Sequence, residues 1–172
     1  MWIAGVLGSL VGLIGIVAVV GMALPREHVA TRSIVLKQRP GEVWPVVADI
    51  AEWPSWNKNL KRVERLADRE GRTVYLVEDS NGALPSEVLQ VTPPPGAMLV
   101  TRIADPDLPF GGTWTWTVAP EGEGCRVSIT ENGSVSNPVF RFVSRFVMGH
   151  HRNMDSYLKE LGRRFGEAVQ PA

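Results

Sequence analysis

The chain has 172 residues, and its 18 Lys and Arg balance 18 Asp and Glu to give a formal net charge of zero. Such a balance leaves no electrostatic footprint for nucleic acid, so we expect no nucleic-acid partner. The single cysteine, Cys125, excludes an internal disulfide framework and a cysteine metal cluster. The chain that follows the first 24 residues is long enough for one domain.

The N-terminal segment is continuously apolar. Residues 1–24 contain no charged side chain, and 12 of these 24 are Leu, Ile or Val. At about 1.5 Å per residue a helix here spans roughly 36 Å, more than the ~30 Å core of a bilayer. We therefore predict a transmembrane anchor over residues 1–24 and a short linker over residues 25–28. The sequence Gly21-Met22-Ala23 leaves cleavage as a signal peptide open.

Charges beside the anchor predict its orientation. Residues 25–41 contain one acidic residue, Glu27, and four basic ones, Arg26, Arg32, Lys37 and Arg39. By the positive-inside rule, the prediction is a single-pass membrane protein whose domain lies in the cytoplasm. Gly8 and Gly12 have the spacing of a helix-pairing motif, which would allow a homodimer through the anchor.

In the segments that follow the anchor, apolar and polar residues alternate as they do in β-strands. A strand is predicted over residues 29–37, followed by an irregular short helix from Pro40 and a second short helix containing Trp53 and Trp56. Six further strands, separated by turn residues, are predicted over 60–67, 73–79, 85–92, 98–104, 113–119 and 125–131. Short connections between successive strands favour an antiparallel meander.

One long C-terminal helix is expected to close the chain. Asn137 suits an N-cap and Pro138 the first helical position. An apolar stripe at helical spacing continues through Val143, Val147, Met154, Leu158, Leu161 and Phe165, which predicts an amphipathic helix of about 30 residues. A sheet that holds such a helix is an α+β arrangement, and we expect an apolar cavity between the two.

Several short motifs follow one another along the chain: the residues from Pro40 to Trp44, 53–56, 112–116, 130–133, and Asn137-Pro138 with the following Phe140 to Phe142. Together and in this order they resemble the START-like, Bet v 1-type (SRPBCC) superfamily, in particular its polyketide cyclase/dehydrase-like branch. The resemblance covers residues 29–168, with 169–172 as a tail. It implies a helix-grip fold with an internal cavity, in a superfamily that includes lipid carriers, hydrophobic-ligand binders and a few aromatase/cyclases.

Aromatic residues are the first candidates for ligand binding. Trp53 and Trp56 lie in the proline-containing short helix, near the expected cavity mouth, whereas Trp114 and Trp116 alternate regularly with threonines. Tryptophan is large and seldom completely buried, so such a cluster can line a cavity. The alternative, which the regular alternation favours for the second pair, is ordinary core packing.

Polar and loop residues are the second group of candidates. Glu78 and Glu131 each end an apolar strand, and His150 lies at the edge of the inward helical stripe. If these side chains face inward, they could bind a ligand or act in catalysis. Otherwise, the two glutamates are strand ends that reach solvent, and His150 is bonded to a neighbour at the helix–sheet seam. Leu108 and Phe110 could gate a cavity entrance, touch lipid or fold back onto the core.

The start of the C-terminal helix, with Phe140, Phe142, Phe146 and Met148 among arginines, suits either a membrane surface or packing against the short helices. No nucleophile–base motif, metal-ligand spacing or phosphate loop stands out, so no catalytic residue, metal or cofactor is predicted. The sequence favours a membrane-tethered, non-enzymatic binder of a hydrophobic small molecule or lipid. A cyclase or dehydratase using His150 with Glu78 or Glu131, and a protein-interaction module, are the alternatives.

Overall fold

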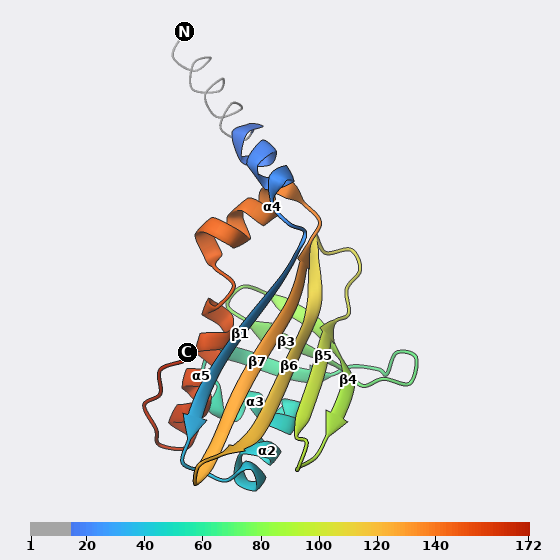
Figure 1. The fold of residues 1–172 in the computed structure, drawn as a ribbon. Coiled ribbons are helices and arrows are strands. Elements are labelled where there is room, and N and C mark those ends of the chain that lie inside the picture. Colours follow the sequence, from blue (N-terminus) through green and yellow to red (C-terminus); the bar gives the residue numbers. More distant parts are fainter. Residues whose placement is uncertain (1–14) are drawn as a thin grey trace.

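The computed structural model describes residues 15–172, which form one curved antiparallel sheet with helices at its two ends and across its concave face (Figure 1). The sheet has seven strands in the order β1-β7-β6-β5-β4-β3-β2. Their bounds are Glu27–Leu36 (β1), Leu60–Arg65 (β2), Val74–Asp79 (β3), Ala83–Thr92 (β4), Met98–Ile103 (β5), Phe110–Glu121 (β6) and Gly124–Val135 (β7). The predicted meander is therefore confirmed, with β1 joining it beside the last strand.

Short helices close the lower end of the sheet in Figure 1. Helix α2 (Pro40–Ala48) is followed by the 3-10 turn η1 (Ile50–Glu52) and the single turn α3 (Trp53–Trp56). Pro40 occupies the first turn of α2, where its missing N–H costs no hydrogen bond. Buried side chains from these helices, Val43, Val47 and Trp53 among them, face the sheet.

The predicted C-terminal helix is divided into separate segments. Helix α4 (Pro138–Val143) begins at the N-cap Asn137, whose side chain accepts from Val139 and Phe140. It continues as the π-helical turn η2 (Ser144–Met148), and helix α5 (Arg152–Arg164) starts only after a break. Gly149 adopts φ +71°, a left-handed conformation that glycine tolerates and that ends a helix.

This break changes which residues reach the core. Met154, Leu158 and Leu161 of α5 are fully buried against the sheet, as the apolar stripe predicted. Val147 lies before the break and is 67% exposed, so the stripe does not continue through it. An ion pair between Arg32 of β1 and Asp155, 2.6 Å apart, also fastens α5 to the sheet.

The described part of the predicted anchor, residues 15–23, is helical. Gly21 is buried against α4, because a Cβ at this position would lie 1.9 Å from the Pro138 carbonyl oxygen. Within residues 15–172, no helix has both the length and the apolar character needed to cross a membrane. Most of the predicted span, including Gly8 and Gly12, lies outside the described residues.

The two edges of the sheet differ in how they are covered. Beside β1, the backbone of Ala172 exchanges two hydrogen bonds with Ser33, at 2.9 and 3.0 Å. On the opposite edge, β2 is short and has the sequence LKRVER, in which four of six side chains are charged. Cys125 lies on the inner face of β7, where burial raises the pKa of its thiol to about 11.

Candidate functional site

Three neighbouring strands place polar side chains on the concave face near the upper end of the sheet. In the register of β1, β7 and β6, Ala30 lies opposite Glu131, and Glu131 lies opposite Trp114. His28 is two residues before Ala30 and therefore points to the same face, opposite Gly133. Glu131 lies well inside β7, which continues to Val135, so this carboxylate does not end its strand.

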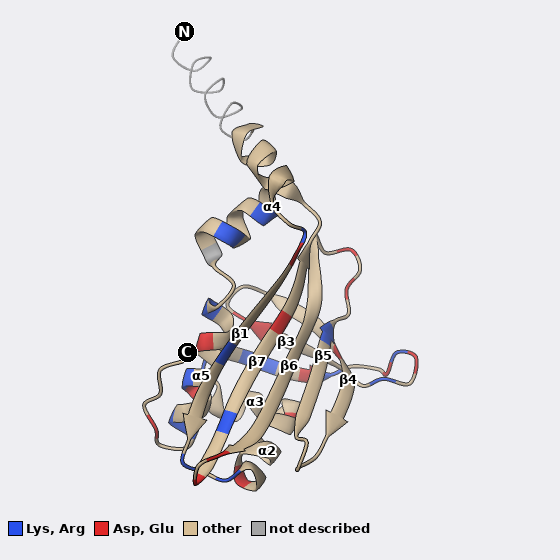
Figure 2. Cartoon of the chain, viewed as in Figure 1, with Lys and Arg blue, Asp and Glu red and all other residues tan. Residues whose placement is uncertain are grey.

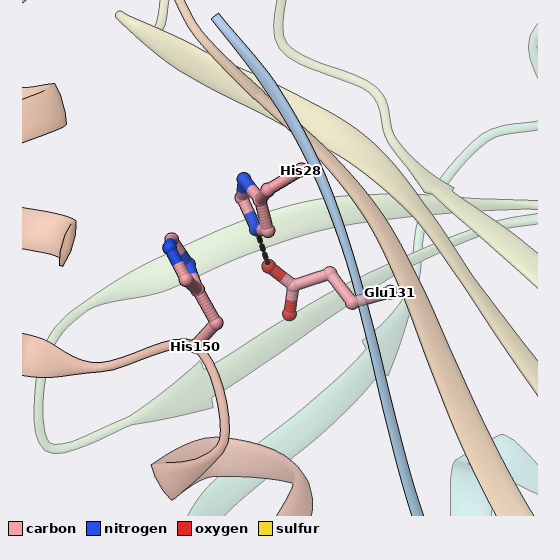
Figure 3. A group of neighbouring side chains, drawn as sticks. All are labelled: His28, Glu131 and His150. Atoms are coloured by element: carbon pink, nitrogen blue, oxygen red, sulfur yellow. Dashed lines mark hydrogen bonds and ion pairs between the residues drawn. The ribbon is translucent and has the colours of Figure 1, made fainter. Parts of the chain in front are cut away.

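Hydrogen bonds hold the Glu131 carboxylate from two sides. The Nε2 of His28 donates to Oε1 at 2.9 Å (Figure 3), and the indole Nε1 of Trp114 donates to Oε2 at 2.8 Å. Both His28 and Glu131 are about one-fifth exposed, at 19% and 22% of their side-chain areas. The carboxylate is thus oriented, while remaining reachable from the concave side.

His150 completes this cluster from the connection between η2 and α5. Its ring stacks on that of His28, with centroids 3.8 Å apart and planes 27° apart. Burial, followed by the nearby His28, lowers the pKa of His150, with Glu131 acting in the opposite sense. His150 is therefore neutral at neutral pH and has a free ring nitrogen that can accept a proton or bind a cation.

A hollow of about 180 Å³ opens beside the two histidines. It lies between the start of β1, the end of β7 and the α4–η2 segment, and its lining includes His28, His150, Arg26, Arg141 and Arg145. Arg141 is buried, and its Nη1 and Nη2 donate to the carbonyl oxygens of Leu24 and Ser136. The hollow is therefore positively charged and connects to the His28–Glu131–His150 cluster.

The predicted apolar cavity between the sheet and α5 is filled by aromatic side chains. Trp53, Trp56 and Trp116 are buried there, and Tyr157 of α5 packs edge-on against Trp53, Trp114 and Trp116 at centroid distances of 5.4 to 6.0 Å. Burial, with a smaller effect of Asp79, raises the pKa of Tyr157. Core packing is thus the observed role of Trp53, Trp56 and Trp116, whereas Trp114 also joins the polar cluster.

Other predicted site residues lie apart from the cluster. Glu78 of β3 is 3.6 Å from Arg62 and 4.0 Å from Lys61, in ion pairs on the opposite half of the sheet. Leu108 and Phe110 are half-buried, and Phe110 begins β6 opposite Val135. The structure therefore brings His150 together with Glu131 and not with Glu78.

Sequence reasoning overlooked His28, which fell in the predicted linker, and Tyr157, which lay in the predicted C-terminal helix but was not among its stripe residues. His28 and Glu131 are separated by 103 positions in the chain, so no local spacing joins them. Pairing of the first and last strands, combined with two-residue alternation, was the signal that could have placed both on one face.

Gly133 provides the space in which the His28 ring lies, and it offers a test of the cluster. A Cβ at Gly133 would lie 2.2 Å from His28 Cε1 and 2.4 Å from Nε2. We expect Gly133→Ala to displace the ring and break its hydrogen bond to Glu131, with little loss of fold because the displaced group is a flexible side chain. Imidazole ¹⁵N chemical shifts measure the change.

Gly111→Ala is the matched control for this substitution. Gly111 lies on the neighbouring strand β6, and its Cβ would meet no atom closer than 3.9 Å. The His28 shifts should be those of the unmodified protein in this variant. Equal shifts in both variants would contradict the geometry described above.

A curved antiparallel sheet holding a C-terminal helix on its concave face defines the helix-grip class of α+β proteins. Consistent with this class, residues 27–166 match the family described as polyketide cyclase / dehydrase and lipid transport. The chain therefore belongs to that family. No curated protein matches the sequence.

Solved structures share the fold at low sequence identity. The Zhui aromatase/cyclase from Streptomyces sp. R1128 has 13% identity and a TM-score of 0.59, with 82% of this chain and 99% of that chain covered. A truncated norcoclaurine synthase from Thalictrum flavum has 13% identity and a TM-score of 0.66, with 82% and 94% covered. A START superfamily protein from Mycobacterium smegmatis has 15% identity and a TM-score of 0.59, with 80% and 96% covered.

Proposed function

We propose that this protein binds the polar head of a hydrophobic small molecule or lipid at a membrane surface. The observation that carries the proposal is the basic hollow, which adjoins the polar cluster on the concave face. Its volume of about 180 Å³ is below the roughly 300–1,000 Å³ of sites that enclose a whole drug-sized ligand. The hollow therefore suits a head group, while the apolar remainder of the ligand stays outside.

Exposed apolar side chains beside the hollow support a membrane location. Phe140, Phe146 and Val147 on α4 and η2 are 45%, 59% and 67% exposed. The adjoining helical segment 15–23 carries no charge (Figure 2), and its Ile16, Val19 and Met22 are also exposed. A surface of this kind is suited to lipid, and anchoring by residues 1–24 would hold it at the bilayer with the domain on the cytoplasmic side.

Charge supports an anionic head group. Arg26, Arg141 and Arg145 line the hollow, with Glu27 as the acidic residue among the lining side chains. The guanidinium of Arg141 is held at the wall of the hollow by its hydrogen bonds to the carbonyl oxygens of Leu24 and Ser136. Guanidinium groups recognise carboxylate and phosphate oxygens well.

Native mass spectrometry of the full chain, released from detergent micelles after incubation with oleic acid or methyl oleate, tests this proposal. We expect an adduct with oleic acid and a much weaker one with its uncharged ester. Ser144→Phe should lower oleic acid retention more than about 10-fold, because Ser144 lines the hollow and the larger ring fills it.

Val147→Phe is the matched control, since it adds an aromatic ring on the exposed side of the same η2 segment. This variant should retain oleic acid as the unmodified protein does. Retention of neither probe by the unmodified protein, or undiminished retention by Ser144→Phe, would contradict the proposed function.

The His28–Glu131 pair favours a cyclase or dehydratase as the second candidate function. A carboxylate that accepts from one imidazole nitrogen fixes the orientation and tautomer of the ring, so that the other ring nitrogen can act as a general base. His150 stacks on His28 in the same site. Turnover of a polyketide-like substrate that is lost in Glu131→Gln would distinguish this candidate from simple binding.

A further inference from the structure

We propose that His28, Glu131 and His150 form a binding site for a divalent transition-metal ion, Zn²⁺ in particular. One ligand atom from each side chain lies within 4.8 Å of the others. Two imidazoles and one carboxylate are a donor set that zinc uses in proteins, and catalytic zinc sites commonly have three protein ligands and one open position. This inference shares its residues with the proposed lipid site but requires no lipid.

Distances within the cluster are close to those of a metal site. Ligand atoms about 2.0–2.1 Å from a tetrahedral zinc ion lie about 3.4 Å from one another. The His28 Nε2 and Glu131 Oε1 are 2.9 Å apart and share a proton, which zinc would replace with a small separation of the two atoms. His150 must turn out of its stacked arrangement to direct a ring nitrogen at the ion.

The position of His150 permits that rotation. It belongs to the connection between η2 and α5, directly after Gly149 with its φ of +71°, and not to the interior of a helix. The His28 ring lies directly against Gly133, whose missing Cβ leaves the space that the ring occupies.

Groups around the cluster supply the remaining parts of a metal site. Trp114 Nε1 donates to Glu131 Oε2, which orients the carboxylate and leaves Oε1 for the ion. The basic hollow provides an entry path and an open coordination position. Arg26 and Arg145 there disfavour a bare cation, so we infer that the fourth ligand is an anion, such as a carboxylate or phosphate oxygen.

Titration of the full chain in detergent with Zn²⁺ alone, followed by calorimetry, tests this inference, and Co²⁺ absorption reports the geometry. We expect one saturable Zn²⁺ site and a visible Co²⁺ spectrum typical of four-coordination. Glu131→Gln and His150→Ala should each weaken Zn²⁺ binding more than about 10-fold.

Two control variants separate the cluster from other metal ligands on the chain. His151→Ala removes the adjacent, exposed histidine, and Glu78→Gln removes a carboxylate from the other half of the sheet; both should bind Zn²⁺ as the unmodified protein does. The inference is overturned if no saturable uptake is seen, or if Glu131→Gln binds Zn²⁺ with unchanged affinity. Oleic acid retention measured without metal reports on the proposed function separately.

Discussion

Substitution of Trp116 by alanine is expected to lower the free energy of unfolding by about 3–5 kcal/mol, because a buried indole is removed and a cavity remains. Trp116 is fully buried on β6, and its ring centroid lies 5.6 Å from that of Trp53 and 6.0 Å from that of Tyr157. Trp116 thus forms, with Trp53 of α3 and Tyr157 of α5, an aromatic cluster that joins both helices to the sheet. Urea unfolding of the full chain, followed by circular dichroism, measures the change.

Trp116→Phe is the informative companion to this substitution. The buried Nε1 of Trp116 has no hydrogen-bond partner within residues 15–172, and phenylalanine removes this unpaired donor while keeping an aromatic ring. We expect Trp116→Phe to lower the free energy of unfolding by less than half as much as Trp116→Ala. Val91→Ala, at a side chain 53% exposed on β4, should change stability by no more than about 0.5 kcal/mol. Equal losses of stability in all three variants would mean that burial of the Trp116 side chain makes no special contribution to the stability of the core.

The second large effect is expected from Arg141→Met, which should lower the free energy of unfolding by about 2–4 kcal/mol. Arg141 is only 6% exposed and donates to the carbonyl oxygens of Leu24 at 2.9 Å and Ser136 at 3.1 Å. Methionine retains much of the side-chain volume, but both carbonyl oxygens lose a charged donor. Because Leu24 lies at the end of the N-terminal helical segment, the α4 contact with that segment should loosen as well.

Limited proteolysis and urea unfolding measure these two consequences. In Arg141→Met, we expect faster cleavage around Pro25 together with a lower unfolding midpoint. Arg145→Met removes the exposed arginine of the adjoining π-helical turn, and we expect no more than about 0.5 kcal/mol of change there. If both variants lost the same stability, general removal of positive charge would explain the result, and the two carbonyl contacts would not.

Hydrophobic alternation accounts for how much of the sheet could be predicted. Trp114, Trp116 and Val118 point to the inner face because strand side chains alternate, and the turn residues between strands set the meander. The break after η2 was not predicted, because an apolar stripe continued in the sequence beyond Gly149. The spacing of apolar residues carries no information on the backbone conformation of Gly149. Its positive φ ends the helix at this residue.

The candidate site was only partly predictable for a related reason. Glu131 and His150 were identified as candidates from their positions in single elements, but their common partner, His28, depends on the pairing of β1 with β7. Strand order is a property of the whole sheet, and the residues in a local window do not fix it. The filled interior was also unpredicted, because only side-chain packing shows that Tyr157 occupies the space among the tryptophans.

The coverage of the two sheet edges has a consequence for solubility. An open strand edge offers unpaired backbone groups to which a strand of another molecule can add, and this is a common start of aggregation. Here the Ala172 backbone already occupies two such groups of Ser33 on β1, while the four charged side chains of β2 repel a second copy of the same strand. Neither edge is a good template for intermolecular strand addition, even at the high local concentration that confinement to a bilayer would produce.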